Sequence, residues 1–444
     1  MSAEQVRPGY KLTEVGMIPE DWEVRRIGEL FDFLSTSSCS RSDLSEDGDV
    51  FYIHYGDIHT TWNYRVDFGQ DVVPRIKAEK VRNVSLLRDG DLVLVDASED
   101  EEGAGKGVEI VNLRGRRAVA GLHTIALRSK DDELADGFKA YIQAMPAVKA
   151  QIRRLVTGLK VFGISKTSLE SILLSLPPLP EQRAIVAALE DVDALLAGLE
   201  RLIAKRRAVK QAAMDALLSG RVRLPGFGQG AGYRQSEVGV LPEDWEVKRI
   251  GEIFDFLSTS SCSRSDLSED GDVFYIHYGD IHTKWNYRVD FDRDVVPRVK
   301  AEKVRNASLL RDGDLILVDA SEDEAGAGKG VEIVNLRGRQ AVAGLHTIAL
   351  RSKSGELADG FKSYIQVMQT VKSQLRRLIT GLKVFGISKA SLGGVMVPLP
   401  FLPEQRAIAA VLSDMDAAIA ALARQRDKVQ ALKQGLMAEL LTGR

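Results

Sequence analysis

One long internal repeat limits the fold of this chain more than any other feature. Residues 9–221 align with residues 232–444 at a constant offset of 223, without a gap. This period is far longer than the roughly 20–50 residues of solenoid repeats. We therefore expect two copies of one domain with its appendage, and the glycine-rich segment 222–231 between them predicts a linker.

The two copies have diverged unevenly. Residues 27–60 match residues 250–283 at 33 of 34 positions, whereas residues 181–221 match residues 404–444 at only 22 of 41. A recent duplication of the globular part, or a requirement that both globular parts do the same work, would explain this pattern. In either case the chain carries two nearly identical surfaces.

The first part of each copy alternates short apolar runs with turn residues, which predicts strands. In the first copy the runs are VFYIHYGD, DGDLVLVDASED, GVEIVNLRGR and AVAGLHTIALRS. The stretch DGFKAYIQAMPAVKAQIRRLVTG then predicts two helices, with Asp136 as N-cap of the first and Pro146 in the first turn of the second. The predicted fold class is α+β, with one mixed α/β globular domain per copy.

A long helix closes each copy. After PEQ, apolar residues recur at alternating spacings of four and three, the heptad pattern of a coiled coil. Each helix would extend over about 40 residues, or roughly 60 Å. A helix with one apolar stripe needs a partner, and antiparallel pairing of the two would relate the globular domains by a pseudo-twofold axis. The alternative is that each helix packs on its own domain.

The predicted boundaries follow from these elements. Residues 1–180 and 232–403 form the globular domains, residues 181–221 and 404–444 form the long helices, and residues 222–231 join the copies. The residues expected at the helix–helix interface are Leu189, Leu196, Leu199, Leu412, Ile419 and Leu422.

Composition and motifs argue against catalysis, metal binding and a membrane location. The string GAGKG at 103–107 lacks the first glycine and the final hydroxyl of a phosphate loop, and a flexible hairpin loop is the better interpretation. The six histidines fall three to a copy without a metal-ligand motif, so we expect no metal and no catalytic residues. No run approaches the roughly 20 apolar residues that cross a bilayer. We expect a soluble, cytoplasmic protein.

Basic residues gather locally, although the net charge of the chain is −3. Between Gly137 and Leu169 there are six basic residues and no acidic one, and the second copy repeats this pattern. We assign Lys139 and Lys149 to solvated helix faces. The others are predicted to contact phosphates: Arg153, Arg154, Lys160 and Lys166, with their counterparts Arg376, Arg377, Lys383 and Lys389.

The stretch VFYIHYGDIHT occurs unchanged in both copies. It and the residues after it place donors, acceptors and aromatic faces around a strand end and loop, a mixture that can read base edges in a DNA groove. The structural alternative is that Tyr52 and Ile53 face a core and Asp57 caps a turn. The residues predicted to contact DNA are His54, Tyr55, His59, Asn63 and Arg65, with counterparts His277, Tyr278, His282, Asn286 and Arg288.

The order of IPEDWEV, HYGDIHT, TGLKVFGISK, LPPLPEQRAI and a long helix, all repeated, resembles the specificity subunit of type I restriction-modification systems. The resemblance covers essentially the whole chain. It implies two target recognition domains that each read half of a bipartite DNA site, and an antiparallel coiled-coil spacer that docks two DNA methyltransferase (modification) subunits. Restriction (nuclease and translocase) subunits would join through them.

The resemblance also implies where chemistry takes place. S-adenosylmethionine, ATP and magnesium would belong to the partner subunits, and this chain would hold no cofactor. The outer faces of the helices and the PEQ turns would form the docking surface. Family members commonly carry two dissimilar recognition domains, whereas these two are near copies. An inverted-repeat target is therefore expected.

Two other functions compete with this one. The chain could be the recognition part of a fused restriction-methylation enzyme, but it lacks the catalytic motifs that such an enzyme needs. It could also be a coiled-coil scaffold without DNA binding, which would leave the duplicated basic patches without a role.

Overall fold

The computed structural model describes residues 6–100, 103–158, 161–321, 326–353, 355–378 and 385–444. The chain divides into two compact units, Met1–Glu200 with Gln425–Arg444, and Arg201–Arg424. The first unit holds the first globular domain, the beginning of the long helix that follows it and the end of the other long helix. The second unit holds the second globular domain, the end of the first long helix and the beginning of the second.

The elements of the first repeat follow in this order: β1 (Tyr10–Thr13), β2 (Gly16–Pro19), β3 (Glu23–Arg26), α1 (Ile27–Leu30), β4 (Phe31–Leu34), β5 (Val50–Ile53), α2 (Tyr55–Thr60), β6 (Tyr64–Asp67), β7 (Arg75–Ile76), β8 (Leu92–Val95), β9 (Ala97–Ser98), β10 (Gly107–Val111), β11 (Ala118–Ala120), β12 (Thr124–Ser129), α3 (Pro146–Leu155), β13 (Phe162–Gly163), α4 (Lys166–Glu170), β14 (Leu173–Leu176) and α5 (Leu179–Leu217). Three short 3-10 helices cover Arg41–Asp43, Ala78–Val81 and Lys139–Ala144.

The second repeat has the same order: β15 (Tyr233–Ser236), β16 (Gly239–Pro242), β17 (Glu246–Arg249), α6 (Ile250–Ile253), β18 (Phe254–Leu257), β19 (Val273–Ile276), α7 (Tyr278–Thr283), β20 (Tyr287–Asp290), β21 (Arg298–Val299), β22 (Leu315–Val318), β23 (Ala320–Ser321), β24 (Gly330–Val334), β25 (Ala341–Ala343), β26 (Thr347–Ser352), α8 (Lys362–Ile365), α9 (Gln369–Leu378), β27 (Phe385–Gly386), α10 (Lys389–Gly393), β28 (Met396–Leu399) and α11 (Leu402–Leu440). Its 3-10 helices cover Arg264–Asp266 and Ala301–Val304.

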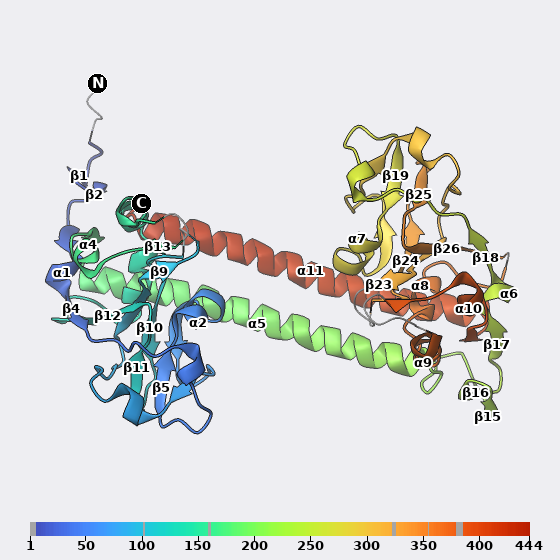
Figure 1. Ribbon diagram of the computed structural model, residues 1–444, viewed down its shortest axis with the longest axis horizontal. Coiled ribbons are helices and arrows are strands. Elements are labelled where there is room, and N and C mark those ends of the chain that lie inside the picture. The colour runs from blue at the N-terminus through green and yellow to red at the C-terminus, as the bar shows by residue number, and fades with distance from the viewer. Residues whose placement is uncertain (1–5, 101–102, 159–160, 322–325, 354, 379–384) are drawn as a thin grey trace. The chain divides into compact units, whose positions relative to one another are not determined.

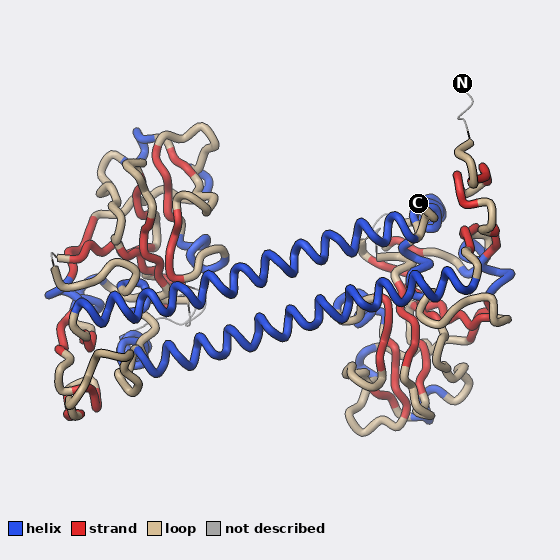
Figure 2. Tube along the Cα trace, turned by 180° about the vertical axis from the view of Figure 1, so that it is seen from behind, coloured by secondary structure: helices blue, strands red, loops and turns tan. Residues whose placement is uncertain are grey.

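Each globular domain is built on a five-stranded mixed sheet, in the order β4-β12-β8-β10-β6 in the first repeat. Strands β10 and β6 are parallel, and the other neighbours are antiparallel. All four residues of β8 are buried because this central strand is covered on both faces. A three-stranded sheet, β11-β5-β7, accompanies it, and its strands lie close to those of the larger sheet (Figure 2).

Both long helices contribute to the core of each unit. In the first unit, Leu189 of α5 is fully buried and shares one apolar cluster with Met437 and Leu441 at the end of α11. Figure 1 shows that end of α11, in red, beside the first domain. Leu189 clusters with Met437 and Leu441, and four residues later Asp193 of α5 bonds to Lys433, four residues before Met437 of α11. The two helical segments of this unit are therefore antiparallel. In the second unit, Leu412 of α11 packs with the end of α5.

These features confirm the predicted α+β class, the repeated mixed domains and the long helices. Each domain packs against segments of both helices, a solution that lies between the two alternatives drawn from the sequence. Pro146 occupies the first position of α3, as predicted. The prediction for Asp136 is wrong, because Phe138 is the N-cap residue of the preceding helix.

Lys139 also differs from its prediction. Its ammonium group is only 4% exposed and lies 2.9 Å from Asp136 Oδ1 and 3.6 Å from Glu109 Oε1. It therefore compensates a buried carboxylate rather than lying on a solvated face.

Candidate nucleic-acid interface

The repeated stretch VFYIHYGDIHT folds as a strand followed by a short helix. Its apolar half, β5, is core, and α2 begins at Tyr55 with His54 as N-cap residue. His54 Nδ1 accepts a hydrogen bond at 3.0 Å from the backbone N–H of Gly56. Burial lowers the pKa of His54, which keeps the imidazole neutral so that Nδ1 can accept. The second repeat has the same cap at His277.

Tyr55 is the centre of an aromatic cluster with three histidines. The centroid of its ring lies 4.6 Å from that of His54, 6.2 Å from that of His59 and 5.4 Å from that of His123. His123 takes a left-handed backbone conformation, with φ of 56°, and its Nδ1 lies 3.5 Å from Oδ1 of Asp96. Tyr278 holds the same cluster in the second repeat. Such rings present both stacking faces and hydrogen-bonding edges.

The loop GAGKG packs against α2. Lys106 Nζ donates a hydrogen bond of 2.7 Å to the backbone carbonyl oxygen of His59, and burial lowers the pKa of Lys106. Gly107 has no room for a side chain, since a Cβ atom there would lie 2.3 Å from Leu94 Cδ2. The last glycine of this string is therefore required by close packing on β8.

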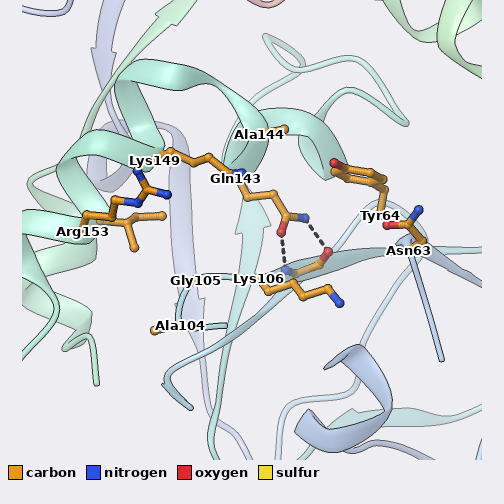
Figure 3. A pocket seen from close by; sticks show the side chains of 11 residues that line it. Asn63, Tyr64, Ala104, Gly105, Lys106, Gln143, Ala144, Lys149 and Arg153 are labelled. Atoms are coloured by element: carbon orange, nitrogen blue, oxygen red, sulfur yellow. Dashed lines mark hydrogen bonds between the residues drawn. The ribbon is translucent and has the colours of Figure 1, made fainter. Parts of the chain in front are cut away.

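A cavity of about 170 Å³ opens beside this loop (Figure 3). Gln143 forms one wall, and its Oε1 accepts a hydrogen bond of 2.6 Å from the Gly107 N–H while its Nε2 donates to the Gly107 carbonyl oxygen. The described lining includes three basic side chains and no carboxylate, which favours an anionic group. The lining residues are Asn63, Tyr64, Ala104, Gly105, Lys106, Gly107, Gln143, Ala144, Lys149, Ile152 and Arg153.

The structure brings part of the predicted set together in the first repeat. Asn63 and Arg153 line the cavity, whereas His54, Tyr55 and His59 share the aromatic cluster. Lys166 begins α4 and is exposed. Ile164, two residues before Lys166, donates a backbone hydrogen bond of 2.8 Å to the carbonyl oxygen of Asp96, so the start of α4 lies beside the segment that contacts His123.

Other predicted residues lie elsewhere. Arg65 NH1 donates a hydrogen bond of 2.8 Å to Glu190 Oε1 on α5, and Arg154 is exposed on α3. Lys160 and Lys383 lie outside the described residues. Which of the predicted side chains contact DNA stays a prediction.

The counterparts in the second repeat follow the same plan, with two differences in their partners. His277, Tyr278 and His282 form the cluster, Asn286 is exposed, and Arg376 and Arg377 are exposed on α9. Arg288 NH1 donates a hydrogen bond of 3.1 Å to the hydroxyl of Ser413, and Lys389 Nζ donates to the carbonyl oxygen of Leu257 at 3.0 Å.

Sequence reasoning missed three residues of this surface. The failed match to a phosphate loop gives no reason to select Lys106, whereas the glycines on either side of it are the residues that indicate close backbone packing. Lys149 is exposed on α3, as predicted, and it also lines the cavity, which its position in the sequence does not indicate. His123 joins the cluster through contacts between segments far apart in the chain, which no local pattern signals.

The ends of the long helices carry a buried ion pair that the sequence did not indicate. Lys433 Nζ is bonded to Asp193 Oδ1 at 2.6 Å, and the lysine side chain is 4% exposed. The ammonium lies 5.1 Å from the ring centroid of Tyr64. Lys210, Asp416 and Tyr287 repeat this arrangement in the second unit.

The residues predicted at the helix–helix interface differ in burial. Leu189 and Leu412 are fully buried in the cores of their units. Leu196 and Leu199 are 8% and 6% exposed, whereas Ile419 and Leu422 are partly buried. That these side chains form a continuous seam stays a prediction.

The PEQ motif is largely turned inward, although its prolines Pro180 and Pro403 are exposed, and its part in a docking surface stays a prediction. Gln182 is 1% exposed; its Oε1 accepts from Ala135 N–H and its Nε2 donates to the carbonyl oxygen of Glu133. In the second repeat Glu404 is 1% exposed and accepts from Arg223 and from Trp245 Nε1. Through these hydrogen bonds, the PEQ motif holds the start of each long helix against the globular domain of its own repeat.

Comparisons with known proteins identify this architecture. A family model described as the type I restriction modification DNA specificity domain matches residues 19–205 and 242–431. The chain is 24% identical over 439 residues to a putative type I restriction enzyme MjaX specificity subunit of Methanocaldococcus jannaschii, covering 98% of this chain and 96% of the relative. It is also 24% identical over 434 residues to the MjaVIII specificity subunit of the same organism, covering 96% and 93%.

A solved structure has the same fold. It is described as the structural basis underlying complex assembly and conformational transition of the type I R-M system, and it aligns with a TM-score of 0.61 at 19% identity. The alignment covers 96% of this chain and 99% of that chain.

The chain therefore belongs to the type I restriction-modification DNA specificity domain family. It is a specificity subunit of that class, a recognition protein rather than an enzyme. Within the described part of the chain, no group of three or more His, Cys, Asp or Glu side chains could hold a metal ion. None of the described helices is sufficiently long and apolar to span a membrane.

Proposed function

We propose that this subunit binds a bipartite, inverted-repeat DNA target, one half-site to each globular domain. The proposal rests on one observation: both units contain the same aromatic cluster, built from the same residues. The capped helix and the neighbouring basic residues are also the same in both. Domains with the same reading residues select the same base string. The cavity lined by Lys106, Lys149 and Arg153 supplies cationic groups for the backbone.

The inverted order of the half-sites follows from how the chain is shared between the units. Helix α5 begins in the first unit and ends in the second, whereas α11 begins in the second and ends in the first. In each unit the two helical segments pair in antiparallel fashion through equivalent Lys–Asp pairs. Exchange of the two repeats therefore leaves these Lys–Asp pairs unchanged, and this supports the proposal that DNA meets the two domains as copies related by a twofold rotation. Duplex DNA has a matching twofold.

The long helices are proposed to dock two methyltransferase subunits, through which restriction subunits join. In the second unit, Leu202 and Val209 of α5 are 38% and 47% exposed and seven residues apart, so they lie on one helix face. Val209 also lines a shallow groove with Val411 and Met415 of α11. S-adenosylmethionine, ATP and magnesium would be held by the partner subunits, and the complex would work in the cytoplasm.

Methylation mapping tests the proposal. The subunit is assembled with its methyltransferase partners, incubated with S-adenosylmethionine and unmethylated genomic DNA, and the modified bases are mapped on single molecules. We expect one bipartite motif whose two halves are reverse complements. An asymmetric motif would contradict the equivalence of the domains or their twofold relation, and the absence of duplex binding would contradict a DNA-reading role.

A further inference from the structure

A groove in the second unit has no chemical equivalent at the same positions of the first. It has a volume of about 530 Å³ and lies between the end of α5, the first half of α11 and the chain around β20. Arg207, Lys210, Arg288 and Arg293 line it, with Asp416 as the acidic residue of its described lining. The lining is therefore strongly basic.

The counterpart positions in the first repeat are mostly acidic or neutral. Four lining positions differ in charge between the repeats, and all four differences make the second unit more positive. Arg207 corresponds to Gln430, Arg293 to Gln70, Ser413 to Glu190 and Ala423 to Glu200. Random divergence of a solvated surface would change charge in both directions.

The difference changes the state of one arginine. In the first unit Arg65 is neutralised by Glu190, with 2.8 Å between NH1 and Oε1. In the second unit the corresponding Arg288 NH1 meets the uncharged hydroxyl of Ser413 at 3.1 Å. The charge of Arg288 is therefore not balanced at this contact, although the backbone around it is the same.

Two further arginines remain available to a ligand. Arg293 has a side chain that is 82% exposed and a long ion pair of 3.6 Å with Asp290. Arg207 is exposed on α5. Lys210 does not add to this supply, because it is 8% exposed and bonded to Asp416 at 2.6 Å.

We propose that this groove binds phosphate groups of the DNA backbone, and that the second half of the protein therefore holds DNA more strongly than the first. Guanidinium groups suit phosphates because their planar donors can bind two oxygens at once. The groove is also lined by Asn286, which belongs to the predicted reading surface, so a strand on that surface reaches it. This inference rests on the proposed DNA-reading function and adds an asymmetry that the near-identical domains do not suggest.

The test converts the groove to the residues of the first repeat. The full-length double variant Arg207→Gln with Arg293→Gln is compared with the natural chain for binding to a fluorescent duplex of arbitrary sequence over a range of salt concentrations. We expect the slope of log affinity against log salt to become shallower by about 2, close to one per lost phosphate contact. The matched control is Arg201→Gln with Arg424→Gln, which removes two exposed arginines of the same helices outside the groove and should leave the slope unchanged.

Each result is decisive. A slope that is unchanged in the groove variant, or that falls equally in the control, overturns the inference while leaving DNA binding intact. An unchanged slope with lost capture of the methyltransferase subunits assigns the groove to an acidic protein surface and also overturns it. Failure of the natural chain, with its partner subunits present, to bind any duplex overturns the proposed function itself.

Discussion

His54 and its counterpart His277 show how a residue selected as a DNA contact can serve the fold. Each side chain is 5% exposed and its Nδ1 accepts from a backbone N–H at the start of a six-residue helix. Only the neutral imidazole can accept there, because a protonated ring has donors on both nitrogens. The cap holds the start of α2, which carries Tyr55 and His59, so we expect the charge state of this buried histidine to affect the surface proposed to read DNA.

This cap predicts an acid-sensitive reading surface. The folded-state pKa of His54 and His277 is lowered by burial. The stability they contribute is therefore fully present above about pH 6.5, the ordinary histidine pKa, and is lost as pH falls through the lower folded-state value. We expect lower protection factors, that is, hydrogen exchange closer to the intrinsic rate at each pH, at the amides of Gly56 and Gly279 on acidification. In the double variant His54→Asn with His277→Asn, an oxygen replaces Nδ1 and this response should disappear; an unaltered response would refute the assignment.

A second residue-scale prediction concerns the ion pair at the helix end. Lys433 is 4% exposed but Asp193 is 40% exposed, so removing one partner leaves very different charges behind. Asp193→Asn strands a buried ammonium and should lower the free energy of unfolding by about 3 kcal/mol. Lys433→Met leaves a carboxylate that water can reach and should cost about 1 kcal/mol. Denaturant unfolding of the full chain measures the loss of unfolding free energy in each variant. A larger loss for Lys433→Met than for Asp193→Asn would show that burial of the lysine does not decide the cost of breaking the pair.

At the scale of elements, each long helix is part of two cores. The start of α5 and the end of α11 complete the first domain, and the end of α5 and the start of α11 complete the second. Helix α11 therefore contributes to stability mainly through its two ends. This is why Leu412 is fully buried whereas Leu422, further along the same predicted stripe, is only partly buried.

Substitutions along the helices should follow this division. Leu189→Ala and Leu412→Ala each create a cavity in a packed core and should each cost about 3 kcal/mol in free energy of unfolding. Leu432→Ala, on a residue that is 62% exposed, should change it by less than about 0.5 kcal/mol. Thermal or denaturant unfolding of the three variants checks the order, and equal costs would argue against cores at the helix ends.

Much of this element structure could be predicted because its signals are local. The apolar run GVEIV predicts strand β10, and Pro146 predicts the start of α3. Both predictions depend on only a few neighbouring residues. The sequence predicts a strand end and loop at HYGDIHT, where the structure has helix α2. The start of this helix gives little local signal, because its N-cap residue is a histidine rather than the usual serine or aspartate. Contacts that join distant segments, such as Tyr55 with His123, carry no local signal.

At the scale of the whole molecule, some equivalent positions of the two repeats are identical, whereas others differ in charge. Thr61 corresponds to Lys284, whose ammonium lies 3.0 Å from Asp280, and Gln70 corresponds to Arg293 in the basic groove. Neither difference alters the aromatic cluster, which has nearly the same ring distances in both units. If the cluster reads bases and the groove binds the DNA backbone, as proposed, these two properties can diverge independently.

This separation gives the last prediction, which follows from the repeat. Asn63 and Asn286 are equivalent, exposed and placed at the entrance of β6 and β20. If each reads a base, Asn63→Ala should relax selectivity at one position of one half-site, and Asn286→Ala at the mirror-image position of the other, each by about 1–3 kcal/mol of discrimination. The double variant should relax both positions and restore the symmetry of the motif.

Methylation mapping of the three assembled complexes measures this directly. Relaxation at unrelated positions would show that the two domains do not read DNA as copies related by a twofold, and unchanged motifs in all three would remove these asparagines from the reading set.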